Sequence, residues 1–136
     1  MTTSEALGLY LHIPFCRQKC GYCGFLSRPV EDPALLAAYT EALRADIRRS
    51  GEPGTFVDTI YFGGGTPTLL STAAIGAILD TIRASFIVAE NAEITVEANP
   101  GTVDQPYLER LRAAGANRLS LGVQSLDDDL LQALGR

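Results

Sequence analysis

Short apolar segments of strand type alternate with longer amphipathic segments along the chain, and this alternation limits the fold more than any other feature of the sequence. The strand-type segments are residues 8–13, 57–62, 93–97 and 118–122. A segment with helical periodicity separates each from the next. Strands joined by single helices pair in parallel through right-handed crossovers. The sequence therefore predicts an α/β fold of about four strand–helix units, with helices covering a parallel sheet, which is half of an eight-unit barrel.

The helical segments carry their own start and stop signals. Asp32 and Ser71 have side-chain oxygens that can cap the first two helices. Gly115 supplies the left-handed residue that often ends a helix, in this case the third. The fourth helix is expected to follow Ser125 and to be shorter than the others. We expect it to bury its leucines, which are Leu130, Leu131 and Leu134.

The C-terminal ends of parallel strands all lie on one rim, where α/β folds place their binding and catalytic sites. Small, polar or ligand-type residues follow all four predicted strands, in residues 14–25, 63–67, 97–100 and 122–124. A sheet with a purely structural role would not require such residues at every strand end. We therefore expect a functional site on this rim.

Three cysteines, Cys16, Cys20 and Cys23, lie in the loop after the first strand. A disulfide would leave one thiol over and is disfavoured in a reducing compartment. A zinc site would need a further ligand such as His12, which lies within a predicted strand and could equally be a structural histidine. An iron–sulfur cluster explains the odd number, because a [4Fe-4S] cluster with three thiolates keeps one iron open for a chelating ligand. The CxxxCxxC spacing is the signature of the radical S-adenosylmethionine (SAM) superfamily and favours this third interpretation.

Other rim residues suit a polar ligand beside such a cluster. Residues 63–65 are glycines, which let the backbone approach a ligand closely and offer it N–H groups, although a glycine run alone indicates only a tight turn. Glu97 could accept hydrogen bonds from ribose hydroxyls or an ammonium group, and would otherwise be a solvated charge. Gln124 could simply be a residue at a helix entrance. Arg136 could pair with a carboxylate or be an ordinary solvated arginine.

Four stretches together resemble the start of the coproporphyrinogen III oxidase-like radical SAM proteins, the HemN and HemW group: YLHIPFCRQKCGYCGF, IYFGGGTPTLL, ITVEANPGTV and LSLGVQSLDDDLLQALGR. The resemblance implies part of a radical SAM (β/α) barrel with a [4Fe-4S] cluster on Cys16, Cys20 and Cys23. It also implies one-electron reduction of the cluster and cleavage of SAM into methionine and a 5′-deoxyadenosyl radical. The positions that match SAM contacts of the family are Tyr10, Tyr22, Gly64, Gly65, Thr66, Glu97, Gln124 and Arg136.

Two features favour the HemW-like branch of this family. Phe25 occupies the position of a fourth cysteine in the HemN branch, and only residues 1–15 precede Cys16, where the HemN branch carries a long segment. The resemblance then implies a haem chaperone that binds haem or a porphyrinogen, with a reducing electron donor protein and possible haem-acceptor protein as partners. Two alternatives stay open: an oxygen-independent coproporphyrinogen III dehydrogenase, which forms protoporphyrinogen IX by oxidative decarboxylation, and a non-radical iron–sulfur or zinc module.

Length and charge limit the remaining possibilities. The 136-residue chain has a net charge of -5 and lacks the clustered basic face that duplex nucleic acid requires. No apolar run approaches the roughly 20 residues of a membrane span, so we expect a cytoplasmic protein without nucleic-acid or membrane partners. Because family members are much longer, residues 1–136 are expected to form the N-terminal part of a radical SAM core domain, with the remaining barrel and a C-terminal domain absent. Its last strand would then be an unpaired edge, and the fragment alone is expected to be inactive and poorly soluble.

Overall fold

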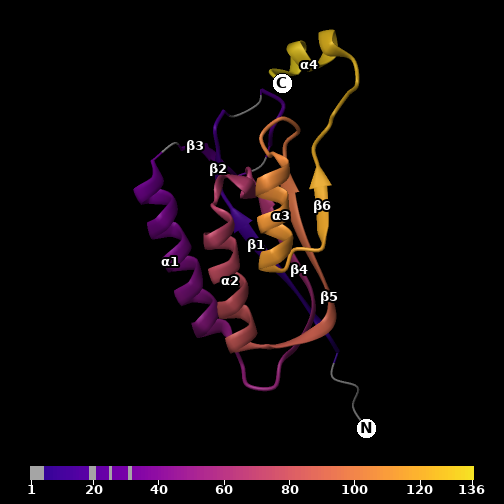
Figure 1. Cartoon of the computed structure of the whole chain (residues 1–136). Coiled ribbons are helices and arrows are strands. Elements are labelled where there is room, and N and C mark those ends of the chain that lie inside the picture. The colour runs from indigo at the N-terminus through magenta and orange to yellow at the C-terminus, as the bar shows by residue number, and fades with distance from the viewer. Residues whose placement is uncertain (1–4, 19–20, 25, 31) are drawn as a thin grey trace.

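The structure is a computed structural model that describes residues 5–18, 21–24, 26–30 and 32–136. Cys20 and Phe25, to which the sequence assigns roles, therefore lie outside the described residues. A four-stranded parallel sheet in the order β1-β4-β5-β6 forms the centre of the molecule (Figure 1). Its strands are β1 (Leu7–Ile13), β4 (Phe56–Gly64), β5 (Ile87–Ala98) and β6 (Arg118–Leu121). The predicted α/β fold with a parallel sheet is confirmed.

Three helices lie side by side along one face of the sheet (Figure 1). They are α1 (Pro33–Ser50), α2 (Thr72–Ser85) and α3 (Gln105–Ala114). A doubly wound sheet would carry helices on both faces, whereas here consecutive strands are neighbours and their helices share a face. This is the arrangement of an arc of a (β/α) barrel. Within the described part of the chain, no helix is both long and apolar enough to cross a membrane.

The hydrophobic core fills the space between the sheet and these helices. Ile60 and Phe62 in β4 and Val96 in β5 are at most 1% exposed, and they meet the fully buried Ile75 and Leu79 of α2. The strand residues that alternate with these buried ones point to the opposite face of the sheet, because side chains alternate along a strand. We call this second surface the open face. Its side chains include Tyr10, His12, Tyr61, Glu97 and Arg118.

The predicted helix ends are confirmed for the three packed helices. The Asp32 side chain accepts a hydrogen bond from the Ala34 amide, and Ser71 caps α2 in the same way. Asp104 caps α3, and Gly115, with φ of 124°, ends it. These local signals therefore mark where each of the three helices begins and where α3 ends.

Three local features of the fold are not apparent in the sequence pattern. The short strands β2 (Phe15–Cys16) and β3 (Arg28–Pro29) pair in parallel and bring the two ends of the cysteine loop together. A 3-10 helix, η1 (Pro67–Leu69), follows the glycine run. The third main strand begins at Ile87 rather than at residue 93, because its first part continues to pair with β4 across a register shift. Strands of two residues are too short for an alternation pattern to reveal them.

The last helix, α4 (Asp128–Leu134), follows Ser125 and is shorter than the others, as predicted, but differs from the prediction in its burial. Its cap is Asp127, whose carboxylate accepts from the Leu130 amide, while Ser125 instead accepts from the Asp127 amide. The expected burial of its leucines is wrong: Leu130 is 57% exposed and no residue of α4 is buried. The physical reason is position, since α4 lies beyond the ends of the strands and away from the packed helices (Figure 1).

Candidate functional site

A cavity of about 160 Å³ lies on the rim of the sheet, at the C-terminal ends of the strands. The predicted site residues that line it are Cys16, Tyr22, Cys23, Gly64, Gly65, Thr66, Glu97, Gln124 and Arg136. Further lining residues from the predicted rim segments are Gln18, Ala98, Asn99 and Gly122, and lining residues outside those segments are Ser27 and Ser120. The structure therefore gathers the predicted residues that it describes around one cavity, with the exception of Tyr10.

Two of the three cysteines can be followed in the structure. Cys16 is buried in β2, and Cys23 is half-buried in the loop; both are free thiols and both line the cavity. The Cys16 thiol lies 3.8 Å from the Ser27 hydroxyl. Cys20 lies outside the described residues, and among the described ones no three Cys, His, Asp or Glu side chains gather as a metal site. Two thiols that face a shared cavity from one loop fit a cluster held by thiolates.

The backbone holds the cysteine loop closed at its base. The Arg28 amide donates to the Pro14 carbonyl at 2.8 Å, and the Val30 amide donates to the Cys16 carbonyl at 3.0 Å. These bonds form the β2–β3 pair and fix the first cysteine against the end of β1. The loop is thus anchored at both ends, which presents its thiols from a defined position.

His12 uses both of its ring nitrogens inside the fold. Nε2 lies 2.8 Å from the Leu26 carbonyl oxygen and Nδ1 lies 3.1 Å from the Tyr10 hydroxyl. A carbonyl can only accept, so Nε2 carries the proton and the Tyr10 hydroxyl donates to Nδ1. In this arrangement His12 ties the end of the cysteine loop to β1 and has no lone pair left for zinc. The interpretation as a structural histidine agrees with these contacts.

The glycine run packs against the segment that leads into Cys16. Gly64 has φ of 111°, and a Cβ there would lie 2.8 Å from the His12 ring; a Cβ on Gly65 would overlap the Phe15 backbone. The Gly65 amide donates to the Ile13 carbonyl at 2.7 Å, and the Thr66 amide donates to the Phe15 carbonyl at 2.6 Å. The expectation that the glycine amides are free for a ligand is therefore wrong for Gly65, and the Thr66 amide is engaged as well. Gly64 and Gly65 thus permit close contact between this loop and residues 12–15.

Glu97 reaches the cavity from the end of β5 and is held by a neighbouring tyrosine. The Tyr61 hydroxyl donates to Glu97 Oε1 at 2.6 Å. This hydrogen bond, together with burial, raises the pKa of Tyr61, so the hydroxyl stays a donor. Tyr10 stacks on Tyr61 with ring centroids 6.0 Å apart, and burial together with the Glu97 charge raises its pKa as well. Tyr10 thus lies on the open face beside Glu97 rather than in the cavity wall.

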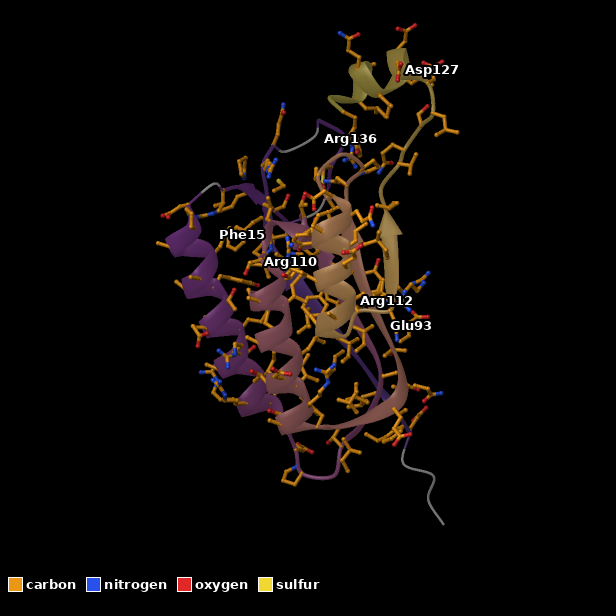
Figure 2. All side chains as sticks on the ribbon, in the orientation of Figure 1. Phe15, Glu93, Arg110, Arg112, Asp127 and Arg136 are labelled. Atoms are coloured by element: carbon orange, nitrogen blue, oxygen red, sulfur yellow. The ribbon has the colours of Figure 1, made fainter. Side chains whose placement is uncertain are left out.

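Arg136 connects the end of α4 with the cysteine loop. Its Nε donates to the Tyr22 hydroxyl at 2.8 Å, and Figure 2 shows it at the rim, beneath α4. Gln124, on the same side of the cavity, has φ of 62° and is the single non-glycine residue with positive φ among those described. A left-handed conformation costs energy for a residue with a side chain, and such residues are concentrated at functional sites.

Asn99 lies in the rim segment 97–100 that the sequence predicted, whereas Ser120 is a site residue that lies outside the predicted rim segments. The Asn99 amide donates to the Thr66 hydroxyl at 3.2 Å and so joins two of the rim loops. Ser120 pairs in register with Glu97 and therefore shares its face of the sheet. Strand alternation would have suggested Ser120 once the register was known. Gln18 and Ser27 carry no comparable pattern, because an irregular loop brings them to the cavity.

Comparison with known proteins gives a consistent result. The family model for the radical SAM superfamily matches residues 10–136. The chain is 45% identical to the heme chaperone HemW of Escherichia coli (strain K12), over 100% of this chain and 36% of that protein. It is 42% identical to an oxygen-independent coproporphyrinogen III oxidase of Bradyrhizobium diazoefficiens, over 100% of this chain and 31% of that protein.

A solved structure shares the fold. Coproporphyrinogen III oxidase (HemN) from Escherichia coli, described as a radical SAM enzyme, matches with a TM-score of 0.88 at 34% identity, over 96% of this chain and 31% of that one. The predicted partial radical SAM barrel is confirmed by this match. The chain spans about a third of the length of the relatives that it matches.

Proposed function

Because this chain belongs to the radical SAM superfamily, whose model matches residues 10–136, we propose that its rim cavity binds a [4Fe-4S] cluster and SAM together. The observation that carries the proposal is that thiols and polar side chains from different segments line one cavity. The Cys16 and Cys23 thiols line the same cavity as the Glu97 carboxylate, the Gln124 amide and the Arg136 guanidinium. A cluster with an open iron and a polar nucleoside ligand needs this combination of soft and hydrogen-bonding groups.

We propose Cys16, Cys20 and Cys23 as the three thiolate ligands. The thiols of Cys16 and Cys23 already face the cavity, and Cys20 lies between them in the CxxxCxxC motif. In the structure the Cys16 thiol donates to the Ser27 hydroxyl. A Cys16 thiolate would have no proton to donate, so the serine hydroxyl would donate to the sulfur instead. Hydrogen bonds of this kind tune cluster potentials.

The proposed SAM contacts divide by chemistry. Arg136 would bind the methionine carboxylate with the Nη groups that remain once its Nε is held by Tyr22, and Glu97 would accept from ribose hydroxyls or from the ammonium group. A cavity of about 160 Å³ is smaller than pockets that enclose a drug-sized ligand, so such a ligand would extend onto the open face, where Tyr10 lies. The further proposed contacts are Tyr22, Gly64, Gly65, Thr66 and Gln124. When bound, the cluster and SAM supply one-electron reductive cleavage of SAM.

For the whole protein we propose a HemW-like haem chaperone, with residues 1–136 as the N-terminal part of its radical SAM core domain. The supporting observations are Phe25, which replaces the cysteine expected in the HemN branch, and the 45% identity to the HemW of Escherichia coli. Haem or a porphyrinogen would be its ligand, and an electron donor protein and a haem-acceptor protein its partners.

A second candidate is oxidative decarboxylation of coproporphyrinogen III. It is favoured by the 42% identity to a protein named oxygen-independent coproporphyrinogen III oxidase and by the fold match to HemN. A third is a zinc or iron–sulfur module without radical chemistry. Its zinc form has less support, because His12 has both nitrogens engaged, and its iron–sulfur form has less support because the radical SAM family model matches residues 10–136.

Anaerobic reconstitution of the full-length protein with iron and sulfide tests these proposals in sequence. We expect a cluster whose spectrum changes on addition of SAM, and 5′-deoxyadenosine after reduction. The Cys20→Ala variant should lose the cluster. Haem titration and an assay for protoporphyrinogen IX then separate the chaperone from the decarboxylase. Stoichiometric zinc without sulfide in oxygen-protected protein would overturn the cluster assignment.

A further inference from the structure

Three side chains from three adjacent strands converge above Gly63 on the open face. A Cβ on Gly63 would lie 2.9 Å from the Tyr61 ring, 3.0 Å from the Tyr10 ring and 3.2 Å from Glu97 Oε2. These distances are tighter than ordinary van der Waals contact, so a glycine at this position lets the two rings and the carboxylate approach one another. The cluster of Tyr10, Tyr61 and Glu97 therefore forms a packed unit directly below the rim cavity.

Within this unit the two oxygens of Glu97 have different surroundings. Oε1 accepts the 2.6 Å hydrogen bond from the Tyr61 hydroxyl. Among the described residues Glu97 forms no ion pair, so the hydrogen bond that holds the carboxylate comes from a neutral donor. Oε2 stays available to a ligand that enters the cavity, because the carboxylate has lone pairs for further donors.

We infer that Tyr61 is a positioning residue for the cofactor, which holds Glu97 in the orientation that receives a cationic or hydroxyl-bearing ligand. This inference rests on the proposed function, in which the ligand is SAM. A glutamate on its own would have to be ordered by the ligand at the moment of binding, and the Tyr61 hydrogen bond removes that entropic cost in advance. Tyr10 supports the arrangement by stacking on the Tyr61 ring.

The persistence of this hydrogen bond has a physical basis. The bond to Glu97 and burial raise the pKa of Tyr61 by more than Ser120 and Arg118 lower it, so the Tyr61 hydroxyl is protonated throughout the neutral range. The ring is half-buried between neighbours on β1 and β5, which limits its rotation. The donor is thus fixed before any ligand arrives.

The test measures SAM affinity separately from cluster assembly. Full-length protein with a reconstituted cluster is dialysed to equilibrium against labelled SAM, and iron and sulfide are counted in the same samples. Tyr61→Phe removes the hydroxyl and keeps the ring, so we expect SAM binding to weaken about tenfold, with unchanged iron and sulfide. Tyr107→Phe is the matched control, because its hydroxyl donates to the Leu70 carbonyl away from Glu97. That control should bind SAM like the wild type.

A double substitution distinguishes positioning from general packing. In a Glu97→Ala background, Tyr61→Phe should cause no further loss of SAM affinity, because nothing remains to be positioned. An unchanged affinity in the single Tyr61→Phe variant overturns the inference, as does a full additive loss in the Glu97→Ala background or a loss of iron. If the wild-type protein with its cluster binds no SAM, the proposed function fails and the inference falls with it, and this is visible before any substitution is made.

Discussion

The two faces of the sheet are built from the same strands and have opposite characters. On the helix-covered face, Ile60 and Phe62 of β4 are fully buried among aliphatic side chains of the helices. On the open face, Tyr61 lies between them in the sequence and makes a hydrogen bond to Glu97. The first face is packed through apolar contacts, and the second is organised through hydrogen bonds, stacking and charge.

This difference indicates how stability and function are divided in the chain. Burial of apolar area is the main favourable term in folding, so the covered face should dominate the free energy of unfolding. The open face and the rim above it hold the groups that could bind a cofactor. Substitutions on the two faces should therefore affect different measurements.

The largest expected effect comes from Phe62→Ala on the covered face. Phe62 is 0% exposed, and its truncation would leave a cavity between β4 and the helices. We expect the free energy of unfolding to fall by about 3–5 kcal/mol, as measured by urea denaturation. The adjacent Tyr61→Ala on the open face should cost clearly less, about 1 kcal/mol. Equal losses at these two neighbouring positions would refute the division between the faces.

The second prediction concerns Gly65, where the rim meets the packed body. A Cβ on this residue would overlap the Phe15 backbone, so Gly65→Ala should displace the β2 segment and destabilise the chain by about 1–3 kcal/mol. This loss should appear in denaturation of the chain without any ligand. If Gly65→Ala unfolded like the wild type and only SAM binding weakened, the glycine would serve the ligand alone, and the packing role described above would be wrong.

Much of the fold could be predicted because the covered face imposes a regular pattern on the sequence. Asp32, Ser71 and Gly115 mark helix ends through local hydrogen bonds and backbone conformation, which the sequence reports directly. The expected burial of the α4 leucines was wrong, because periodicity shows which residues share a face but not what that face contacts. Whether a helix face is buried depends on the elements that pack against it.

The site was predictable to the extent that topology determines it. Parallel strands bring Glu97 and Gln124 to the same rim, so spacing along the sequence suffices to group them. The role of Tyr61 depends on the register that places it beside Glu97, and that register is set by β4–β5 pairing. The engaged amide of Gly65 likewise follows from contacts with a distant segment. Such details require the three-dimensional arrangement.

The third prediction concerns how the free energy of unfolding depends on alkaline pH through Tyr107, a residue of α3. Burial raises the pKa of Tyr107 to about 12, well above the value of about 10 for an exposed tyrosine. Between these values the unfolded chain has lost a proton that the folded chain keeps, so the free energy of unfolding falls as pH rises. The full contribution would be about 1.4 kcal/mol per pH unit, and because Tyr107 is only half-buried, screening by solvent should reduce it to roughly half.

Tyr107→Phe isolates this contribution from those of the other tyrosines. Burial or hydrogen bonding also raises the pKa of Tyr10, Tyr39 and Tyr61, so the wild type should lose stability from several groups above pH 10. Urea denaturation at pH 9 and pH 11 should show a smaller loss for Tyr107→Phe than for the wild type. The same pH dependence in both proteins would show that Tyr107 ionises equally well when folded.

The smallest expected effect is a gain in stability from Gly76→Ala. Gly76 lies inside α2, and a Cβ there would meet the Ala114 Cβ of α3 at 3.6 Å, which is ordinary van der Waals contact. Alanine restricts the unfolded chain and has the higher helix propensity, so the free energy of unfolding should rise by roughly 0.5 kcal/mol. Urea denaturation of Gly76→Ala beside Gly65→Ala compares the same added methyl in two places. A loss at both positions would mean that the α2–α3 contact is as tightly packed as the rim, and the distinction between a tolerant covered layer and a crowded rim would no longer hold.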